Sequence, residues 1–189
     1  MSAASGALAA GLNALTEAVH AACNDPADAI RLLYGLATFV PAPAVSYATP
    51  IGQAVYTTSW ATAALCRRAA LVSLARTCAD FAPTSYDDAV EIRDDVADAL
   101  DAESQVAADA GDVDTYLALR ALRTAVVDDL TTRGAQLPRL ATFTRAASLP
   151  ALTLAYQIYG DTTRADDLVA RADPPHPAFM PLAFVALAD

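Results

Sequence analysis

Runs of apolar residues at helical spacing, separated by proline and glycine, constrain the fold of this chain more than any other feature. The first run has apolar residues at steps of four, three and four, which places them on one helix face: Leu8, Leu12, Leu15 and Val19. Similar runs follow along the chain. They predict five helices, over about residues 3–23, 27–39, 53–81, 86–108 and 112–133. The sequence therefore predicts a mainly α-helical body.

Cap residues and helix breakers mark the ends of these predicted helices. Asp25 can cap the second helix, and Pro26 suits its first position because the N–H that proline lacks would be unpaired there. Thr84 to Asp88 has the pattern of a capping box, with a short acid at its third position. Gly134 is expected to close the fifth helix as a C-terminal cap. The prolines within 41–50 predict an extended loop.

After Gly134 the pattern changes to short segments. Residues 137–144 alternate between two faces and contain threonine and phenylalanine, which favour a strand. Ser148 is expected to cap a short helix with Pro150 in its first turn, and Asp161 to cap another. The predicted order is strand, helix, helix, strand, over residues 137–144, 149–159, 164–171 and 179–187.

The composition excludes several classes of protein. Apolar residues make up 55% of the chain and charged residues 18%, which excludes disorder of the whole chain. The net charge of −10 repels phosphate backbones and argues against sequence-independent nucleic-acid binding. The cysteines, Cys23, Cys66 and Cys78, are odd in number and form no C-x-x-C motif. We therefore expect buried reduced thiols rather than a disulfide framework or a zinc site.

The longest uncharged stretch, from Leu32 to Cys66, predicts a surface for a partner. It is long enough to cross a membrane, but its prolines and polar residues argue against a transmembrane helix. Aromatic residues within it suit a protein interface, and a role in the core is equally compatible with the sequence. These residues are Tyr47, Tyr56 and Trp60. We expect the stretch to be adhesive or disordered when the chain is alone, because such an apolar surface needs cover.

No sequence motif predicts catalysis, and we expect neither enzymatic activity nor a cofactor or metal site. His20 and Cys23 share a helix face, but a metal site needs three or four ligands and no second pair follows. We expect His20 to pack in the core or to be partly exposed, and His176 to act in a turn between prolines. Arg120 and Arg123 lie one helical turn apart and could hold a phosphate, although pairing with aspartates is the simpler expectation.

Four segments in the second half of the chain resemble a known family. They are RALRTAVVDDLTTRGAQLPRL (120–140), ASLPALTLAYQIYGD (147–161), RADDLVAR (164–171) and HPAFMP (176–181). From about Ser85 onward the chain resembles the C-terminal region of the Mu-type phage tail protein known as the DNA circularisation protein, a baseplate component. The strand–helix–helix–strand order also resembles a LysM module, with Tyr159 to Asp161 at the turn between its helices.

The resemblance implies a structural protein of a contractile phage tail, located in the baseplate or hub of the virion and assembled in the host cytoplasm. Its expected partners are tube, spike, wedge and tape-measure proteins, together with further copies of itself. In the LysM-like module the expected contact residues are Tyr159, Asp161, Arg164, His176 and Phe179. Two alternatives stay open: DNA binding that circularises injected genome ends, and binding of peptidoglycan glycans through the LysM-like module.

Together these patterns predict a mainly α-helical protein with a small α+β module of βααβ order at its C-terminal end. The expected divisions are an N-terminal helical segment at 1–40, a proline-rich linker at 41–52, a helical body at 53–134 and the LysM-like module at 135–189. We expect partners to be proteins, with no membrane span and no nucleic acid.

Overall fold

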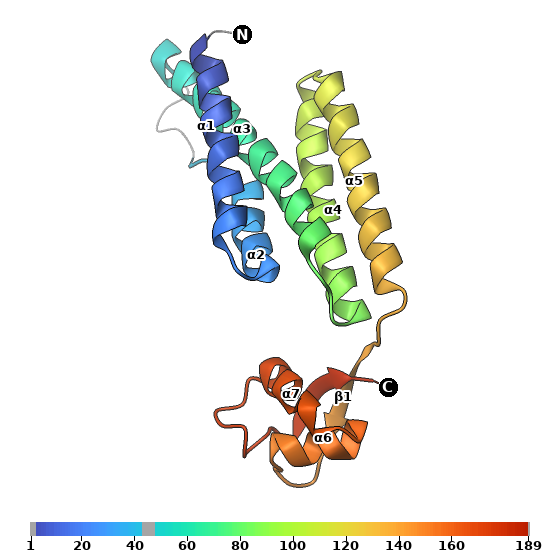
Figure 1. Cartoon of the computed structure of the whole chain (residues 1–189). Helices are drawn as coiled ribbons and strands as arrows, with labels where there is room; N and C mark the ends of the chain where they lie inside the picture. The colour runs from blue at the N-terminus through green and yellow to red at the C-terminus, as the bar shows by residue number, and fades with distance from the viewer. Residues whose placement is uncertain (1–2, 43–47, 189) are drawn as a thin grey trace. The chain divides into compact units, whose positions relative to one another are not determined.

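The structure, a computed structural model, describes residues 3–42 and 48–188 (Figure 1). It is mainly helical with a small antiparallel sheet near the C-terminus, which confirms the predicted class. The elements are α1 (Ala3–Ala22), α2 (Pro26–Ala37), α3 (Pro50–Asp80), α4 (Tyr86–Asp109), α5 (Val113–Gly134), β1 (Leu140–Thr144), α6 (Ala151–Tyr159), the 3-10 turn η1 (Thr162–Arg164), α7 (Ala165–Ala172) and β2 (Ala183–Leu187).

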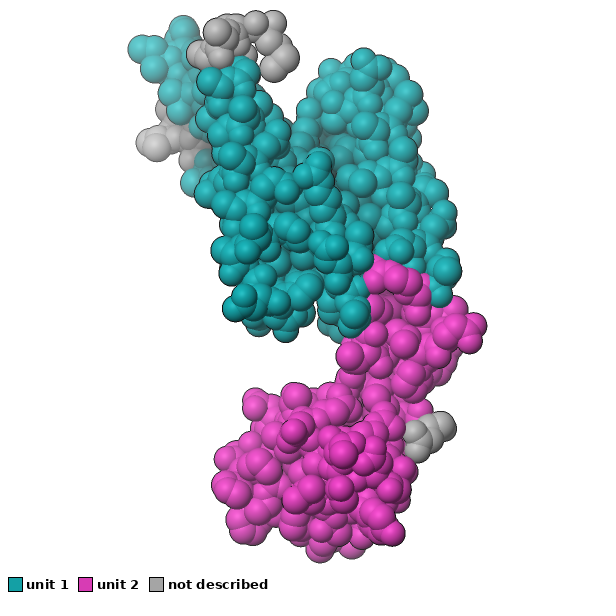
Figure 2. All heavy atoms as spheres, viewed as in Figure 1, with its two compact units in different colours: residues 1–82, 90–132 teal, residues 83–89, 133–189 magenta. Residues whose placement is uncertain are grey.

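The chain forms two compact units, drawn in different colours in Figure 2. The first contains residues 1–82 and 90–132, and the second contains 83–89 and 133–189. The start of α4 and the end of α5 therefore belong to the second unit, although most of both helices belongs to the first. The finer division of the chain into four parts stays a prediction.

The five predicted helices of the first part of the chain are confirmed as α1 to α5. The Asp25 carboxylate accepts a hydrogen bond from the Ala27 N–H at 2.9 Å, the cap expected for α2. Helix α3 begins at Pro50, inside the stretch predicted as loop, because Thr49 caps it and a proline is pre-organised for a first helical position. The rest of that loop falls largely on residues 43–47, which lie outside the described part.

Leucines from four helices form the core of the first unit. Those of α3 pack with residues of α2, α4 and α5 in one cluster, and each is fully buried: Leu33, Leu71, Leu74, Leu100 and Leu130. Figure 1 shows α4 and α5 running side by side as an antiparallel pair. Burial of a leucine side chain contributes about 1.5–3 kcal/mol, so this cluster is the main source of stability for the helical unit.

In the second unit, β1 pairs with β2 in antiparallel register, with Leu140 opposite Leu187 and Thr144 opposite Ala183. The rings of Phe143 and Phe184 stack across the pair with centroids 6.1 Å apart. Two short helices, α6 and α7, cover this sheet. Their buried Leu154, Ala155 and Leu168 form a small core with Met180, which lies between α7 and β2. Both strands are shorter than predicted, because strand pairing is confined to Leu140–Thr144 and Ala183–Leu187.

One predicted helix cap is wrong. Ser148 does not cap α6: its hydroxyl donates to the Met180 carbonyl at 2.8 Å, and Pro150 takes the cap position without a side-chain hydrogen bond. Helix α5 ends at Gly134 as predicted, but this glycine is not left-handed: positive φ is found at Gly111, Gly160 and Asp173. A Cβ at Gly134 would lie 2.8 Å from the Cβ of Ala89, so this glycine is needed for the close approach of two helices.

The start of α4 is held to α7 by a small polar cluster within the second unit. Ser85 caps the helix by accepting from the Asp88 N–H at 3.0 Å. The Asp88 carboxylate accepts from the Thr84 hydroxyl at 2.9 Å and from Arg171 at 3.3 Å. Partial burial works to raise the pKa of Asp88, but the hydrogen bonds from Ser85, Arg171 and Thr84 outweigh it and hold the pKa below 3.8.

This lowered pKa predicts a pH-dependent effect of Asp88→Asn. A carboxylate whose pKa is lowered by folding stabilises the fold above its ordinary value of 3.8 and loses that contribution as pH falls through the folded value. At neutral pH we expect the variant to lower the free energy of unfolding of the second unit by about 1 kcal/mol. The effect is small because solvent screens an ion pair that is partly exposed. Amide hydrogen exchange in β1 and β2 measures the loss. A deficit that is unchanged at acid pH would contradict the role of the charge.

Candidate functional site

Helix α1 contacts α3 through polar side chains. Ser73 donates its hydroxyl to the Glu17 carboxylate at 2.8 Å, and Arg76 forms an ion pair with the same carboxylate at 2.7 Å. The hydrogen bond from Ser73 holds the pKa of Glu17 below its ordinary value, and the charge of Arg76 adds to this. The Nδ1 atom of His20 lies 2.9 Å from the Thr77 hydroxyl. His20 is half-buried, so the expectation that it packs or is partly exposed holds.

Two leucines of α1 remain exposed, although Val19 of the same helix packs against the core of the first unit. Leu8 is 48% exposed and Leu15 is 59% exposed. Helix α2, the loop residues Phe39 and Val40 that follow it, and the first half of α3 also carry exposed large apolar side chains, of which Ile51 is the most open at 78%. We call this set the apolar surface of the first unit: Leu8, Leu15, Leu32, Leu36, Phe39, Val40, Ile51, Val55 and Trp60. Large exposed apolar side chains of this kind are candidates for contact with a partner.

Two of the aromatic residues predicted for an interface lie together on α3. The rings of Tyr56 and Trp60 have centroids 5.8 Å apart and are tilted against each other. Trp60 is exposed, and Tyr56 is half-buried. Tyr47 lies outside the described residues. The pair therefore adds an aromatic contact to the apolar surface.

The predicted contact residues of the second unit lie in two turns. The Asp161 carboxylate accepts from the Thr163 N–H at 2.8 Å and from its hydroxyl at 2.7 Å, and these bonds hold the pKa of Asp161 below its ordinary value. The Arg164 guanidinium lies over the Tyr159 ring, 3.8 Å from its centroid. Asp161 therefore caps η1, and the Tyr159 ring is covered on one face.

His176 has the turn role that its neighbouring prolines predict. Its Nδ1 accepts from the Ala178 N–H at 3.0 Å, and its carbonyl accepts from the Phe179 N–H at 2.9 Å. The rings of His176 and Phe179 have centroids 6.1 Å apart, and Phe179 is strongly exposed. Among the predicted contact residues of this unit, Phe179 offers the most open apolar side chain.

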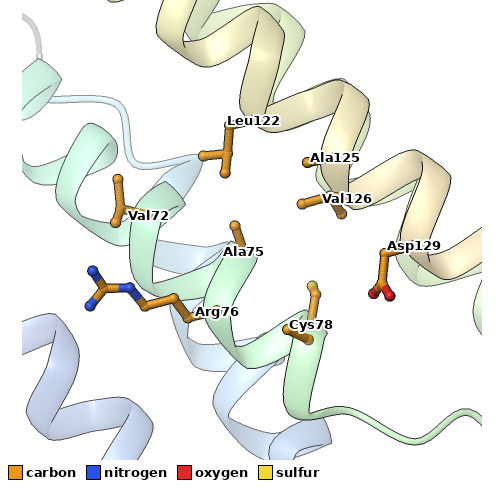
Figure 3. A pocket seen from close by; sticks show the side chains of 9 residues that line it. Val72, Ala75, Arg76, Cys78, Leu122, Ala125, Val126 and Asp129 are labelled. Atoms are coloured by element: carbon orange, nitrogen blue, oxygen red, sulfur yellow. The ribbon is translucent and has the colours of Figure 1, made fainter.

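An apolar groove of about 370 Å³ lies between α3 and α5 within the first unit. In Figure 3 the side chains of Val72, Ala75 and Cys78 on α3 face those of Leu122 and Val126 on α5. Arg76 and Asp129 also line the groove. Its lining can hold apolar side chains, and it offers no arrangement of groups for catalysis.

A buried ion-pair cluster joins α3 to α4, and the sequence did not reveal it. Arg67 and Glu103 are 7% and 2% exposed, and Arg67 Nε lies 2.7 Å from Glu103 Oε2. Arg68 bridges the other oxygen of Glu103, at 2.9 Å, to the Asp112 carboxylate, at 3.2 Å. Hydrogen bonds from Thr115, and then the charge of Arg68, hold the pKa of Asp112 below its ordinary value. The sequence feature that could have indicated this cluster is the adjacent pair Arg67 and Arg68, which lies in an otherwise apolar stretch of helix.

The other basic pair is also bound to carboxylate. Arg120 and Arg123 both reach Asp101 of α4, at 2.8 and 2.7 Å. The expected pairing with aspartate is therefore confirmed, and it neutralises part of the charge that a phosphate would need. Among the described residues, no cluster of three or more His, Cys, Asp or Glu side chains is placed to hold a metal ion.

A search of family models and of curated proteins finds no match to this chain. Within the described ranges, none of the helices combines the length and the apolar character that a membrane crossing requires. The assignment of a function therefore depends on the surfaces described above.

Proposed function

We propose that this chain is a structural component of a contractile phage tail, an adaptor in the baseplate or hub between tube, tape-measure or spike proteins and the baseplate wedges. The observation that carries the proposal is the apolar surface of the first unit. The family resemblance of the second half of the sequence supplies the phage assignment. The role is adhesive and needs no catalytic group.

The energetics of the apolar surface favour an assembled state. Covering a fully exposed aliphatic side chain contributes about 1.5–3 kcal/mol, and Ile51 and Val40 are among the most exposed. A partner that covers several of these side chains binds tightly without any specific polar contact. A chain that works alone gains nothing from leaving them open.

The charge distribution supports a protein partner more than DNA. The net charge is −10, and arginines that could contact phosphate are already paired with carboxylates. Arg68, Arg120 and Arg123 are examples. A DNA-binding role would require these ion pairs to break, at a cost that phosphate contacts would have to offset.

For the second unit we propose a LysM-like module that docks on other tail proteins. The order β1, α6, η1, α7, β2 with antiparallel pairing of the two strands supports this proposal. The guanidinium of Arg164 occupies one face of Tyr159, which leaves less of that ring for a sugar to stack on. The exposed Phe179 supplies an apolar side chain for a protein contact.

Charge placed within the apolar surface should strongly weaken assembly. We expect Ile51→Asp combined with Val55→Asp to weaken association with neighbouring tail proteins by about 100-fold, because two apolar contacts are lost and two charges are buried. Size-exclusion chromatography with light scattering, on the chain alone and co-expressed with adjacent tail-gene products, measures this.

The matched control is Ala108→Asp combined with Ala110→Asp, which adds the same two charges at exposed positions that do not belong to the apolar surface. It should retain most of the complex. A wild-type chain that stays monomeric with every tail partner would refute the proposed function. Equal losses in the control and in the double variant would show that general charge, rather than the apolar surface, governs assembly.

A further inference from the structure

The side of α3 that holds α1 continues beyond the part that α1 covers. Thr16 of α1 contacts the Ala69 carbonyl and the Ser73 hydroxyl, and these two residues of α3 are 5% and 1% exposed. A spacing of 18 residues is about five helical turns. Ile51 therefore lies on the same side of α3 as Ala69. Val55 in turn lies on the same side as Ser73. Yet Ile51 is 78% exposed and Val55 is 54% exposed, so half of this helix-docking face is open.

Helix α1 does not reach the open half of the face. Thr16 bonds Ser73, and His20 lies 3.4 Å from Asp80, so α1 and α3 run parallel in a fixed register. In this register α1, which begins at Ala3, starts about two turns short of the first turn of α3. The open half therefore continues an existing helix–helix contact, and a further helix can extend that contact.

Two helix segments form this end of the first unit, and neither contributes to its core. They are Gly6–Leu15 of α1 and Pro50–Thr62 of α3, which we call the arm. The structure describes every residue of both segments, and none of them is buried. Helices of this length gain most of their stability from packing an apolar face, so the arm is stabilised by whatever covers it.

The polar groups of the arm are compatible with burial. Neither segment contains a charged residue. The hydroxyls of Thr57 and Thr58 donate to the Gln53 and Ala54 carbonyls of their own helix, at 3.0 and 2.8 Å. Because these hydroxyls already have acceptors, covering them leaves no hydrogen bond unmade.

We propose that the arm pairs with the arm of a second copy of this chain about a two-fold axis, with Ile51 and Val55 of one copy packed against Leu8 and Leu15 of the other. Leu8 and Leu15 lie two turns apart on one side of α1 and are 48% and 59% exposed. In a two-fold contact each copy supplies both halves, so the same set of contacts forms twice.

The distribution of charge favours a second copy and a closed dimer. The net charge of −10 is carried entirely outside the arm. Two copies repel each other across their charged surfaces, and the arm lets them meet without bringing carboxylates together. A basic partner would instead be attracted to the acidic surface. Two-fold pairing occupies both arms, so association stops at two copies.

The inference deepens the proposed function, because it names the partner of one part of the apolar surface. The exposed side chains of α2 and the loop after it stay available to other tail proteins: Leu32, Leu36, Phe39 and Val40. Self-association can be measured on the purified chain without any tail protein.

Sedimentation equilibrium of the whole chain, over about 1–100 μM, tests the pairing. We expect a monomer–dimer equilibrium with a dissociation constant of about 10 μM. Added salt should not weaken it, because the interface contains no ion pair. Ile51→Asp combined with Val55→Asp should weaken dimerisation at least about 100-fold. The matched control, Ala108→Asp with Ala110→Asp, should leave it unchanged, since both positions are exposed and lie outside the arm.

A mixing experiment tests which residues meet. Leu8→Lys combined with Leu15→Lys should also prevent self-association. When this variant is mixed with the aspartate variant, half of the contacts are native and the other half pair lysine with aspartate. The mixed dimer should therefore be at least about tenfold tighter than either variant with itself. Far-UV circular dichroism checks that both variants, which change only exposed positions, keep their helices.

Several results would overturn the pairing. They are a wild-type chain that stays monomeric at 100 μM, open-ended oligomers in place of a dimer, equal losses in the aspartate variant and its control, and folded variants that form no mixed dimer. A monomer that still joins a tail complex would overturn the pairing and leave the proposed function intact. A dimer that joins no tail complex would do the reverse.

Discussion

Glu103→Gln is expected to lower the free energy of unfolding of the first unit by about 3–5 kcal/mol, because it leaves a buried guanidinium without a counter-charge. Glu103 is 2% exposed and is the shared partner of Arg67 and Arg68. Glutamine has nearly the same shape, so the loss measures charge and not volume. Urea denaturation followed by Trp60 fluorescence reports on this unit.

The control for this prediction lies on the same helix. Asp94 pairs with Arg93 on the surface, with its side chain 59% exposed. Asp94→Asn should change stability by no more than about 1 kcal/mol, since water solvates both charges when the pair is broken. The double variant Arg67→Met with Glu103→Leu should recover much of the loss, because neither charge is then buried alone. Equal effects of the two single variants would contradict the buried pair.

Leu168→Ala is expected to destabilise the second unit by about 2–5 kcal/mol. Leu168 is fully buried in the small core that α6 and α7 form over the two strands. A unit of this size buries little apolar surface, so the loss is a large share of its stability. Amide hydrogen exchange should show lost protection in β1 and β2, while the amides of α2 and α3 keep theirs.

Leu152→Ala makes the same chemical change on α6 at a side chain that is 60% exposed. It should change stability by less than about 0.5 kcal/mol, because no cavity forms at the surface. Comparable losses of protection from both variants would contradict the packing described. Loss of protection in α2 and α3 together with the strands would show that the two units unfold as one.

The helices could be predicted because their signals are local. The spacing of Leu8 and Val19, the cap at Asp25 and the turn at Gly160 each act within a few residues. The ends of the two strands were predicted less accurately than the helices, because hydrogen bonding to the partner strand decides where a strand stops. Ser148 shows the limit of local reasoning, since its hydroxyl bonds a carbonyl 32 residues away.

The candidate surfaces were only partly predictable. The sequence left Trp60 open to an interface or a core role, and the structure places it exposed on α3 beside Tyr56. The partner of Arg67 was not expected, since Glu103 is 36 residues away on another helix. The exposure of Leu15 was not expected either, because helical spacing shows that a face exists but not which neighbour covers it.

The sequence by itself determined the helical class, the approximate extent of the main helices, and the net negative charge, because these depend on neighbouring residues and on sums over the chain. Only the tertiary structure decided which side of α1 faces α3, why Gly134 has no side chain, and that Arg67 is buried against Glu103. These depend on which elements pack together, and a buried charge or a close helix contact exists only when both partners are in place.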